Sequence, residues 1–122
     1  MRGKAVLTFA VLAAGGALMV SGTASAGGGA ETKVTIKAPG GDVFGKVKSP
    51  KARCVEDRVV KVYRVKGGSP GGGDDIKVGT DGADADGDWS VGQPGVSGKR
   101  IYAKVAKIQG CQKDRSKVIK AG

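Results

Sequence analysis

The chain has 122 residues, of which 23 are glycine and none is histidine, and its formal net charge at pH 7 is +10. Without histidine, Ser–His–Asp and Cys–His catalytic arrangements are excluded, and a chain of this length has room for one small domain. The basic balance favours attraction to polyanions such as nucleic acid, anionic lipid or acidic cell-wall polymers.

The first 26 residues predict a cleaved secretory signal peptide. Arg2 and Lys4 form a short basic region, and an uncharged run of small and apolar residues follows it. Ala24 and Ala26 then give the small-x-small pattern that signal peptidase accepts. The apolar run is shorter than the ~20 residues of a bilayer span. We therefore expect a secreted protein that no membrane holds after cleavage.

The exported part is predicted to begin with a flexible lead-in, residues 27–31, and to continue as one domain over residues 32–120. Cys54 and Cys111, the only cysteines, both lie in this domain. In an oxidising compartment such a pair predicts a structural disulfide. Metal ligation and thiol catalysis are the alternatives, but the chain lacks histidine and a Cys-x-x-Cys motif.

Seven short runs in the domain alternate apolar and polar residues, and segments rich in glycine, proline and aspartate separate them. The runs cover residues 32–38, 43–48, 57–66, 75–80, 87–91, 99–108 and 115–120. This pattern predicts an all-β fold, a seven-stranded antiparallel β-sandwich with one disulfide. No window shows the periodicity of an amphipathic helix.

The alternation also predicts which side chains form the core, because successive residues of a strand point to opposite faces. Trp89 is expected to pack centrally, with ligand stacking as the alternative role. The residues expected to point inward are Val34, Ile36, Val47, Val60, Val62, Ile76, Val78, Trp89, Val91, Ile101, Ala103 and Val105.

Five short motifs follow one another along the domain: Gly45-x-Val47, Val60-x-Val62, Gly79-Thr80-Asp81, Asp86-Gly87-x-Trp89, and Gly98 leading into Tyr102-Ala103-Lys104-Val105. Over most of residues 32–120 this series resembles the carboxypeptidase regulatory-like and transthyretin-like (prealbumin-like) β-sandwich domains, in their small secreted bacterial form. The chain departs from that pattern by the insertion of residues 83–86 and by its cysteine pair. The resemblance implies an Ig-like or prealbumin-like sandwich that serves as an accessory, spacer or ligand-binding module without catalytic residues.

Four aspartates crowd into the predicted hairpin of this otherwise basic chain: Asp81, Asp84, Asp86 and Asp88. Carboxylates at such spacing are candidate oxygen ligands for calcium. The EF-hand pattern does not fit, because Trp89 stands where that loop needs glycine when the count starts at Asp84. The other interpretation is a polar turn whose aspartates cap backbone groups.

Lysines occur in nearly every predicted strand, which is typical of a solvated sheet face and discourages aggregation through strand edges. The predicted mature chain keeps 19 of the 21 basic residues against 11 acidic ones, but only four aromatic residues. We therefore expect no specific nucleic-acid partner. The glycine-rich segment 67–73 is predicted to be a flexible exposed loop, since no Gly-Lys-Ser/Thr follows it to bind phosphate.

These observations together predict a secreted, monomeric, non-catalytic β-sandwich module with a binding or structural role at the cell envelope. Its lysine-rich strands favour an acidic cell-wall polymer or polysaccharide as partner. Two alternatives remain: a calcium-dependent adhesion module that uses Asp81 to Asp88, and a small secreted inhibitor or effector. The second alternative needs an ordered, protruding loop, for which residues 67–74 are the candidate.

Overall fold

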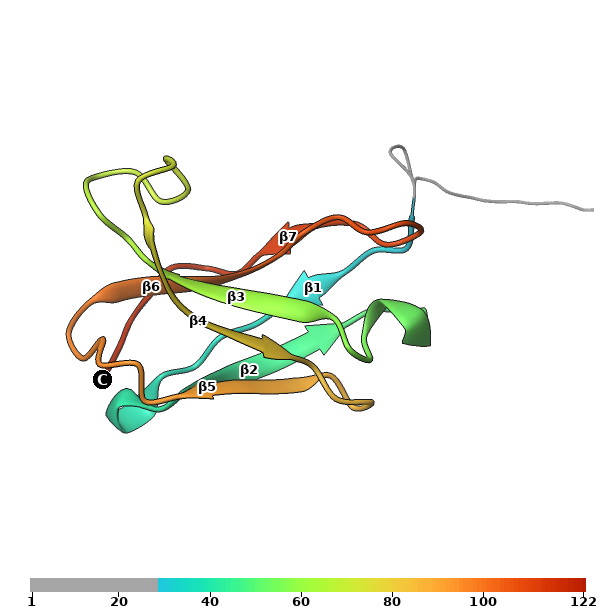
Figure 1. The fold of residues 1–122 in the computed structure, drawn as a ribbon, viewed down its shortest axis with the longest axis horizontal. Coiled ribbons are helices and arrows are strands. Elements are labelled where there is room, and N and C mark those ends of the chain that lie inside the picture. Colours follow the sequence, from blue (N-terminus) through green and yellow to red (C-terminus); the bar gives the residue numbers. More distant parts are fainter. Residues whose placement is uncertain (1–28) are drawn as a thin grey trace, which may run out of the picture.

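The computed structural model describes residues 29–122 (Figure 1), so the predicted signal peptide, with Ala24 and Ala26, lies outside the described residues. The described part is built of eight strands and two short 3-10 helices, without an α-helix. In chain order they are β1 (Lys33–Val34), η2 (Pro39–Gly41), β2 (Val43–Lys48), η3 (Ala52–Cys54), β3 (Val59–Arg64), β4 (Ile76–Gly82), β5 (Asp88–Gly92), β6 (Arg100–Val105), β7 (Asp114–Arg115) and β8 (Ile119–Lys120).

The strands form two antiparallel sheets, which confirms the all-β prediction. The smaller sheet has the order β1-β2-β5, and the larger has the order β4-β3-β6-β7, with β8 also paired to β6. Figure 1 shows β3, β6 and β7 in one layer above β2 and β5. Within residues 29–122 no helix has the length and apolar character that a membrane span requires.

The last predicted strand, residues 115–120, is divided into two. Ser116 causes the division, because its hydroxyl takes the place of a backbone acceptor: the amide of Ala103 donates to Ser116 Oγ (2.8 Å), while the amide of Ser116 donates to the carbonyl of Ala103 (2.8 Å). The chain therefore stays beside β6 through a side chain, with two-residue strands β7 and β8 on either side. The count is thus eight strands, against the seven predicted.

The core lies between the sheets, and nine of the twelve residues predicted to point inward are buried. Val78 and Val91 are partly buried against the core. The prediction for Ile76 is wrong, since 39% of this residue is exposed. Ile76 begins the edge strand β4, where the register against β3 shifts between Val62 and Tyr63.

Trp89 packs in the core as predicted, with 2% of its surface exposed. It faces Gly45 on the neighbouring strand β2, and a Cβ at Gly45 would lie 2.8 Å from Cζ2 of the indole and clash with the carbonyl of Thr35. A residue without a side chain at position 45 therefore gives room to both the indole and the segment after β1.

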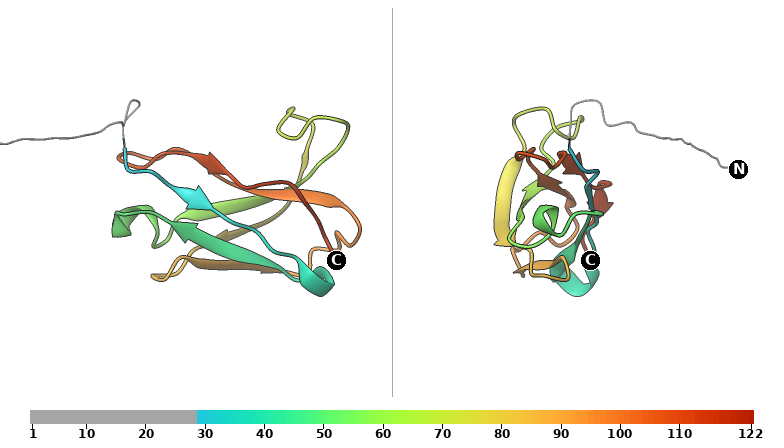
Figure 2. Two further views of the ribbon diagram at one scale, coloured as in Figure 1. Left: turned by 180° about the vertical axis from the view of Figure 1, so that it is seen from behind. Right: turned by 90° about the vertical axis from the view of Figure 1, so that its right-hand side faces the viewer.

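Carboxylates link the two sheets at both of their open edges. At one edge, Asp81 on β4 accepts a hydrogen bond from the amide of Ser90 on β5 (2.8 Å). At the other edge, Asp114 on β7 accepts one from the amide of Val34 on β1 (2.8 Å). Figure 2 shows β1 between β2 and the β7 side of the larger sheet. Each carboxylate occupies an edge N–H that would otherwise be free to pair with another chain.

One end of the sandwich is held by the disulfide between Cys54 and Cys111, whose Cα atoms lie 5.5 Å apart although the residues are 57 positions apart in sequence. The cysteines are fully buried. The disulfide joins η3 to the turn that enters β7. A loop of this length is expected to stabilise the fold by roughly 4 kcal/mol in the chain-entropy account.

Arg58 lies beside the disulfide with only 3% of its surface exposed. Its Nη1 donates to Thr32 Oγ1 (3.2 Å) and to the carbonyl of Cys54 (3.0 Å), and its Nη2 donates to the carbonyls of Ala106 and Gln112 (both 2.7 Å). Burial lowers the pKa of the guanidinium from its ordinary value. Four neutral oxygens from four separate segments therefore solvate this charge, and we call the group the Arg58 junction.

The described part of the predicted flexible lead-in is attached to this end of the fold. The amide of Ala30 donates to the carbonyl of Gly110 (2.9 Å), and the amide of Gln112 donates to the carbonyl of Ala30 (2.9 Å). At the other terminus the domain continues past residue 120, since Ala121 is buried and Gly122 donates to the carbonyl of Ala38 (2.8 Å). Backbone pairing of this kind gives no periodic side-chain pattern in the sequence.

The Arg58 junction predicts a large difference between two conservative substitutions. Arg58→Lys keeps the charge but replaces a planar fork by a single ammonium group, so that buried carbonyls lose donors. We expect a loss of about 2 kcal/mol in the free energy of unfolding. Arg100→Lys is the control, because Arg100 is exposed and donates one hydrogen bond, to the carbonyl of Gly67. Denaturant unfolding measures both; equal losses would contradict the role given to Arg58.

Candidate functional site

The outer face of the larger sheet carries a row of three basic side chains on three adjacent strands. Lys61 on β3 lies directly opposite Lys104 on β6, and Lys104 lies directly opposite Arg115 on β7. Residues directly opposite each other in a ladder point to the same face. We call Lys61, Lys104 and Arg115 the basic row.

None of the three cations of the basic row forms an ion pair within the described residues, although the charge of Arg115 helps to lower the pKa of the nearby Asp75 carboxyl. In residues 29–122 the one ion pair is formed on the smaller sheet, between Lys46 and Asp88 (2.8 Å). Like charges directly opposite each other destabilise a sheet. The basic row therefore carries an excess of positive charge, and binding of an anion would reduce the repulsion between its members.

Two tyrosines form the base on which the basic row is held. Tyr63 on β3 lies opposite Tyr102 on β6, and their rings stack with centroids 5.6 Å apart and an angle of 22° between the planes. Nζ of Lys104 lies 5.9 Å from the ring centroid of Tyr63, and Cζ of Arg115 lies 5.5 Å from that of Tyr102. Cation–π attraction thus limits where both charges can move.

The segment of residues 67–74, the glycine loop, is mostly exposed, as predicted, and charged side chains form hydrogen bonds with its backbone. The carboxylate of Asp75 accepts hydrogen bonds from the amides of Lys66 (3.0 Å) and Gly71 (2.7 Å). Arg115 donates to the carbonyl of Pro70 (3.1 Å), and Arg100 donates to that of Gly67. Figure 1 shows that the glycine loop projects from the sandwich between β3 and β4.

A hollow of about 480 Å³ lies between the glycine loop and β7. Three of its lining residues are basic: Lys104, Lys113 and Arg115. Its one acidic lining residue, Asp114, directs a carboxylate oxygen to the amide of Val34. The hollow is therefore electropositive, and its charge favours an anionic group.

Tyr102 and Asp75 connect the tyrosine pair to the glycine loop. Tyr102 is 2% exposed, and its phenol donates to Asp75 Oδ2 (2.6 Å). Burial, and then this hydrogen bond, raise the pKa of Tyr102 to about 12. The same hydrogen bond, with those from the amides of Lys66 and Gly71, lowers the pKa of the Asp75 carboxyl.

These shifts define the pH range over which the pair stabilises the fold. The lowered pKa of Asp75 contributes stability at pH values above the ordinary pKa of an aspartate. This contribution is lost as the pH falls through the lowered pKa. The raised pKa of Tyr102 contributes stability below the ordinary tyrosine value of about 10, and this is lost as the pH rises towards 12.

A titration tests this link. In a Tyr63→Phe background, Tyr102 is the only tyrosine, and phenolate absorbance follows its ionisation alone. We expect the pKa of Tyr102 to fall towards its ordinary value in Asp75→Asn, since the negative charge that opposes phenolate formation is gone. Asp74→Asn, the adjacent exposed aspartate, is the control. Identical titration curves for the two variants would contradict the link.

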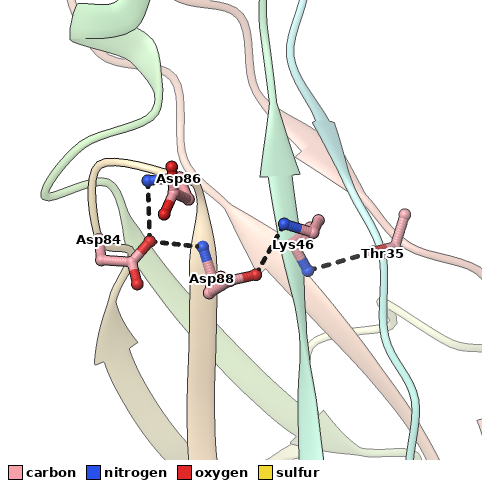
Figure 3. Close-up of polar contacts among 5 residues, drawn as sticks. All are labelled: Thr35, Lys46, Asp84, Asp86 and Asp88. Carbon is pink, nitrogen blue, oxygen red and sulfur yellow. Dashed lines mark hydrogen bonds and ion pairs between the residues drawn. The ribbon is translucent and has the colours of Figure 1, made fainter.

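The acidic hairpin brings three of the four predicted aspartates together. Carboxylate oxygens of Asp84, Asp86 and Asp88 lie within 4.8 Å of one another, and all three residues are exposed. Asp84 Oδ1 accepts hydrogen bonds from the amides of Asp86 and Asp88 (both 2.9 Å), and Asp88 pairs with Lys46, as Figure 3 shows. These contacts are those of the polar turn, in which an aspartate caps backbone groups.

Asp81, the fourth predicted aspartate, lies apart from this group and holds the amide of Ser90 across the sheet edge. A second hollow, of about 570 Å³, lies beside it and is lined in part by Asp42, Asp84 and Asp88. Lys46 already neutralises Asp88 on this side of the molecule. A calcium site at this hairpin remains a prediction, now confined to Asp84, Asp86 and Asp88.

The sequence interpretation named none of the residues of the basic row as a site. Lys61 and Tyr63 on one strand, and Tyr102 and Lys104 on another, alternate with residues predicted to point inward, so their common face was readable from the sequence. The place of Arg115 on this face could not be predicted from the sequence, because its position beside Lys104 depends on how the chain returns after the disulfide.

Comparison of the chain with protein-family models, with curated proteins and with solved structures finds no match.

Proposed function

We propose that the protein is a secreted, non-catalytic β-sandwich module that binds acidic polymers at the cell envelope through the outer face of its larger sheet. The observation that carries this proposal is the basic row, in which three neighbouring cations form no ion pair within the described residues. Surfaces of one sign of charge concentrate ligands of the opposite sign.

The aromatic residues favour a polymer other than nucleic acid. Proteins that bind single-stranded nucleic acid stack its bases on free aromatic faces. Here Tyr102 is 2% exposed, and the two tyrosine rings stack on each other, with Lys104 and Arg115 beside them. The tyrosines support the cations, and this arrangement leaves charge as the means of recognition.

A non-catalytic role is supported by how the carboxylates are used. Asp75, Asp81 and Asp114 each accept hydrogen bonds from backbone amides, and Asp84 caps the hairpin. The chain has no histidine to act as a base. A module that binds and does not react is also what the resemblance to carboxypeptidase regulatory-like and transthyretin-like domains implies.

Three further properties belong to the proposal. We infer an Ig-like or prealbumin-like sandwich, on the order of the Gly45, Gly79 and Trp89 motifs along strands β2, β4 and β5. We infer export, on the signal-peptide pattern of residues 1–26 and on a disulfide, which persists in oxidising compartments. We infer a monomer, since carboxylates occupy amides at both open edges of the sandwich.

A second candidate, a secreted inhibitor or effector, gains support from one observation. It requires an ordered, protruding loop, and the glycine loop is held by Asp75, Arg100 and Arg115. In this alternative the loop, and not the sheet face, would contact the partner.

The proposed function predicts salt-sensitive binding. Protein expressed from the full chain, with its disulfide formed, is passed over immobilised acidic polysaccharide, wall polymer and neutral glucan. We expect retention on the acidic matrices at low salt and earlier elution as salt increases, because salt screens exposed charges. Neutral glucan should retain none.

The same columns test both alternatives. Binding that requires added calcium would favour the adhesion module at Asp84, Asp86 and Asp88. Retention that is equal on neutral and acidic matrices, or absent from all of them, would contradict the proposed function and leave the glycine loop as the candidate contact.

A further inference from the structure

We propose that the ligand is an acidic polysaccharide with one carboxylate on each sugar, and that it lies across the strands of the larger sheet with its carboxylates on Lys61, Lys104 and Arg115. This inference rests on the proposed function and assigns the polymer, its direction and the residues that contact it.

The arrangement of the basic row favours a stiff polymer. Its members stand one per strand, on β3, β6 and β7, directly opposite one another. Adjacent strands lie about 4.8 Å apart, so the row extends over about two strand spacings and fits a ligand of a few sugars. A pyranose chain is stiff and loses little conformational freedom when several of its carboxylates contact the row, whereas a glycerol phosphate chain is flexible and loses more.

Arg115 anchors one end of the row because it is already positioned. Its guanidinium lies 5.5 Å from the ring centroid of Tyr102 and uses one hydrogen bond, to the carbonyl of Pro70. A guanidinium has five N–H donors in a planar fork, which matches the two oxygens of a carboxylate. The donors that remain are available to a ligand in a side chain that has already lost much of its freedom.

The electropositive hollow beside Arg115 gives the polymer a place to continue past the row. Lys113 and Lys104 line it together with Gly71 of the glycine loop. A substituent on a bound sugar, or the next sugar of the chain, would enter there. The glycine loop would then contact the same ligand as the sheet face.

The smaller sheet supplies a matched control. Lys33 on β1 lies directly opposite Lys48 on β2, as Lys61 lies opposite Lys104. Both members of the control pair are exposed. That pair lacks a positioned arginine beside it. Replacing both of its lysines by glutamine removes the same charge from the molecule as the double substitution in the basic row. Differences between the two double variants therefore report position and not net charge.

The experiment is calorimetric titration with a galacturonate oligosaccharide, a glycerol phosphate polymer and single-stranded oligothymidine at physiological salt. We expect galacturonate to bind most tightly to the unmodified protein. Lys61→Gln with Lys104→Gln should weaken binding by about tenfold or more, and Lys33→Gln with Lys48→Gln by less than about twofold. Arg115→Lys, which keeps the charge, should weaken it by about threefold or more. All variants should remain folded, with a cooperative thermal transition like that of the unmodified protein.

The outcomes separate the two proposals. If the unmodified protein binds none of the probes, the proposed function fails. If it binds galacturonate but the two double variants lose affinity equally, attraction is diffuse, and the further inference is overturned while the proposed function stands. Tighter binding of glycerol phosphate polymer or oligothymidine would overturn the assignment of the ligand.

Discussion

The fold depends on how one buried charge is solvated. Arg58 donates to oxygens of Thr32, Cys54, Ala106 and Gln112, and so joins its own neighbourhood to the segment before β1 and to the connection between β6 and β7. A guanidinium without these acceptors would pay a large desolvation cost on burial, and these carbonyls without it would lose their donors. The disulfide of Cys54 fixes the same end covalently. Each contact therefore depends on the segments that the others hold in place.

The Arg58 junction is also connected to one end of the proposed binding face. Arg58 holds Gln112, two residues before Asp114, whose carboxylate links β7 to the amide of Val34. With β7 fixed in this way, Arg115 lies beside Lys104 and reaches Pro70 of the glycine loop. A stabilising contact at one end of the sandwich is thus connected, residue by residue, to the arrangement of cations on its outer face.

Much of the fold was readable from the sequence, because alternation of β-branched residues in strands such as Val59–Arg64 reports burial directly. The features that the sequence did not predict depend on contacts that leave no periodic pattern. The role of Arg58 requires four partners from separate segments, and the division at Ser116 requires a hydroxyl in a backbone ladder. Part of the candidate site could be predicted from the sequence, because Lys61 and Lys104 follow the outward alternation of their strands. The position of Arg115 could not, because it depends on how the chain returns after Cys111.

The central claim is that a polyanion binds the outer face of the larger sheet through the basic row. Nuclear magnetic resonance of isotope-labelled protein, titrated with a galacturonate oligosaccharide, tests it most directly, because each amide reports its own surroundings. The account predicts the largest shift changes at Lys61, Lys104 and Arg115, and little change at Lys33 or at the Asp84–Asp88 hairpin. Changes spread evenly over all lysines, or concentrated at the hairpin, would contradict it.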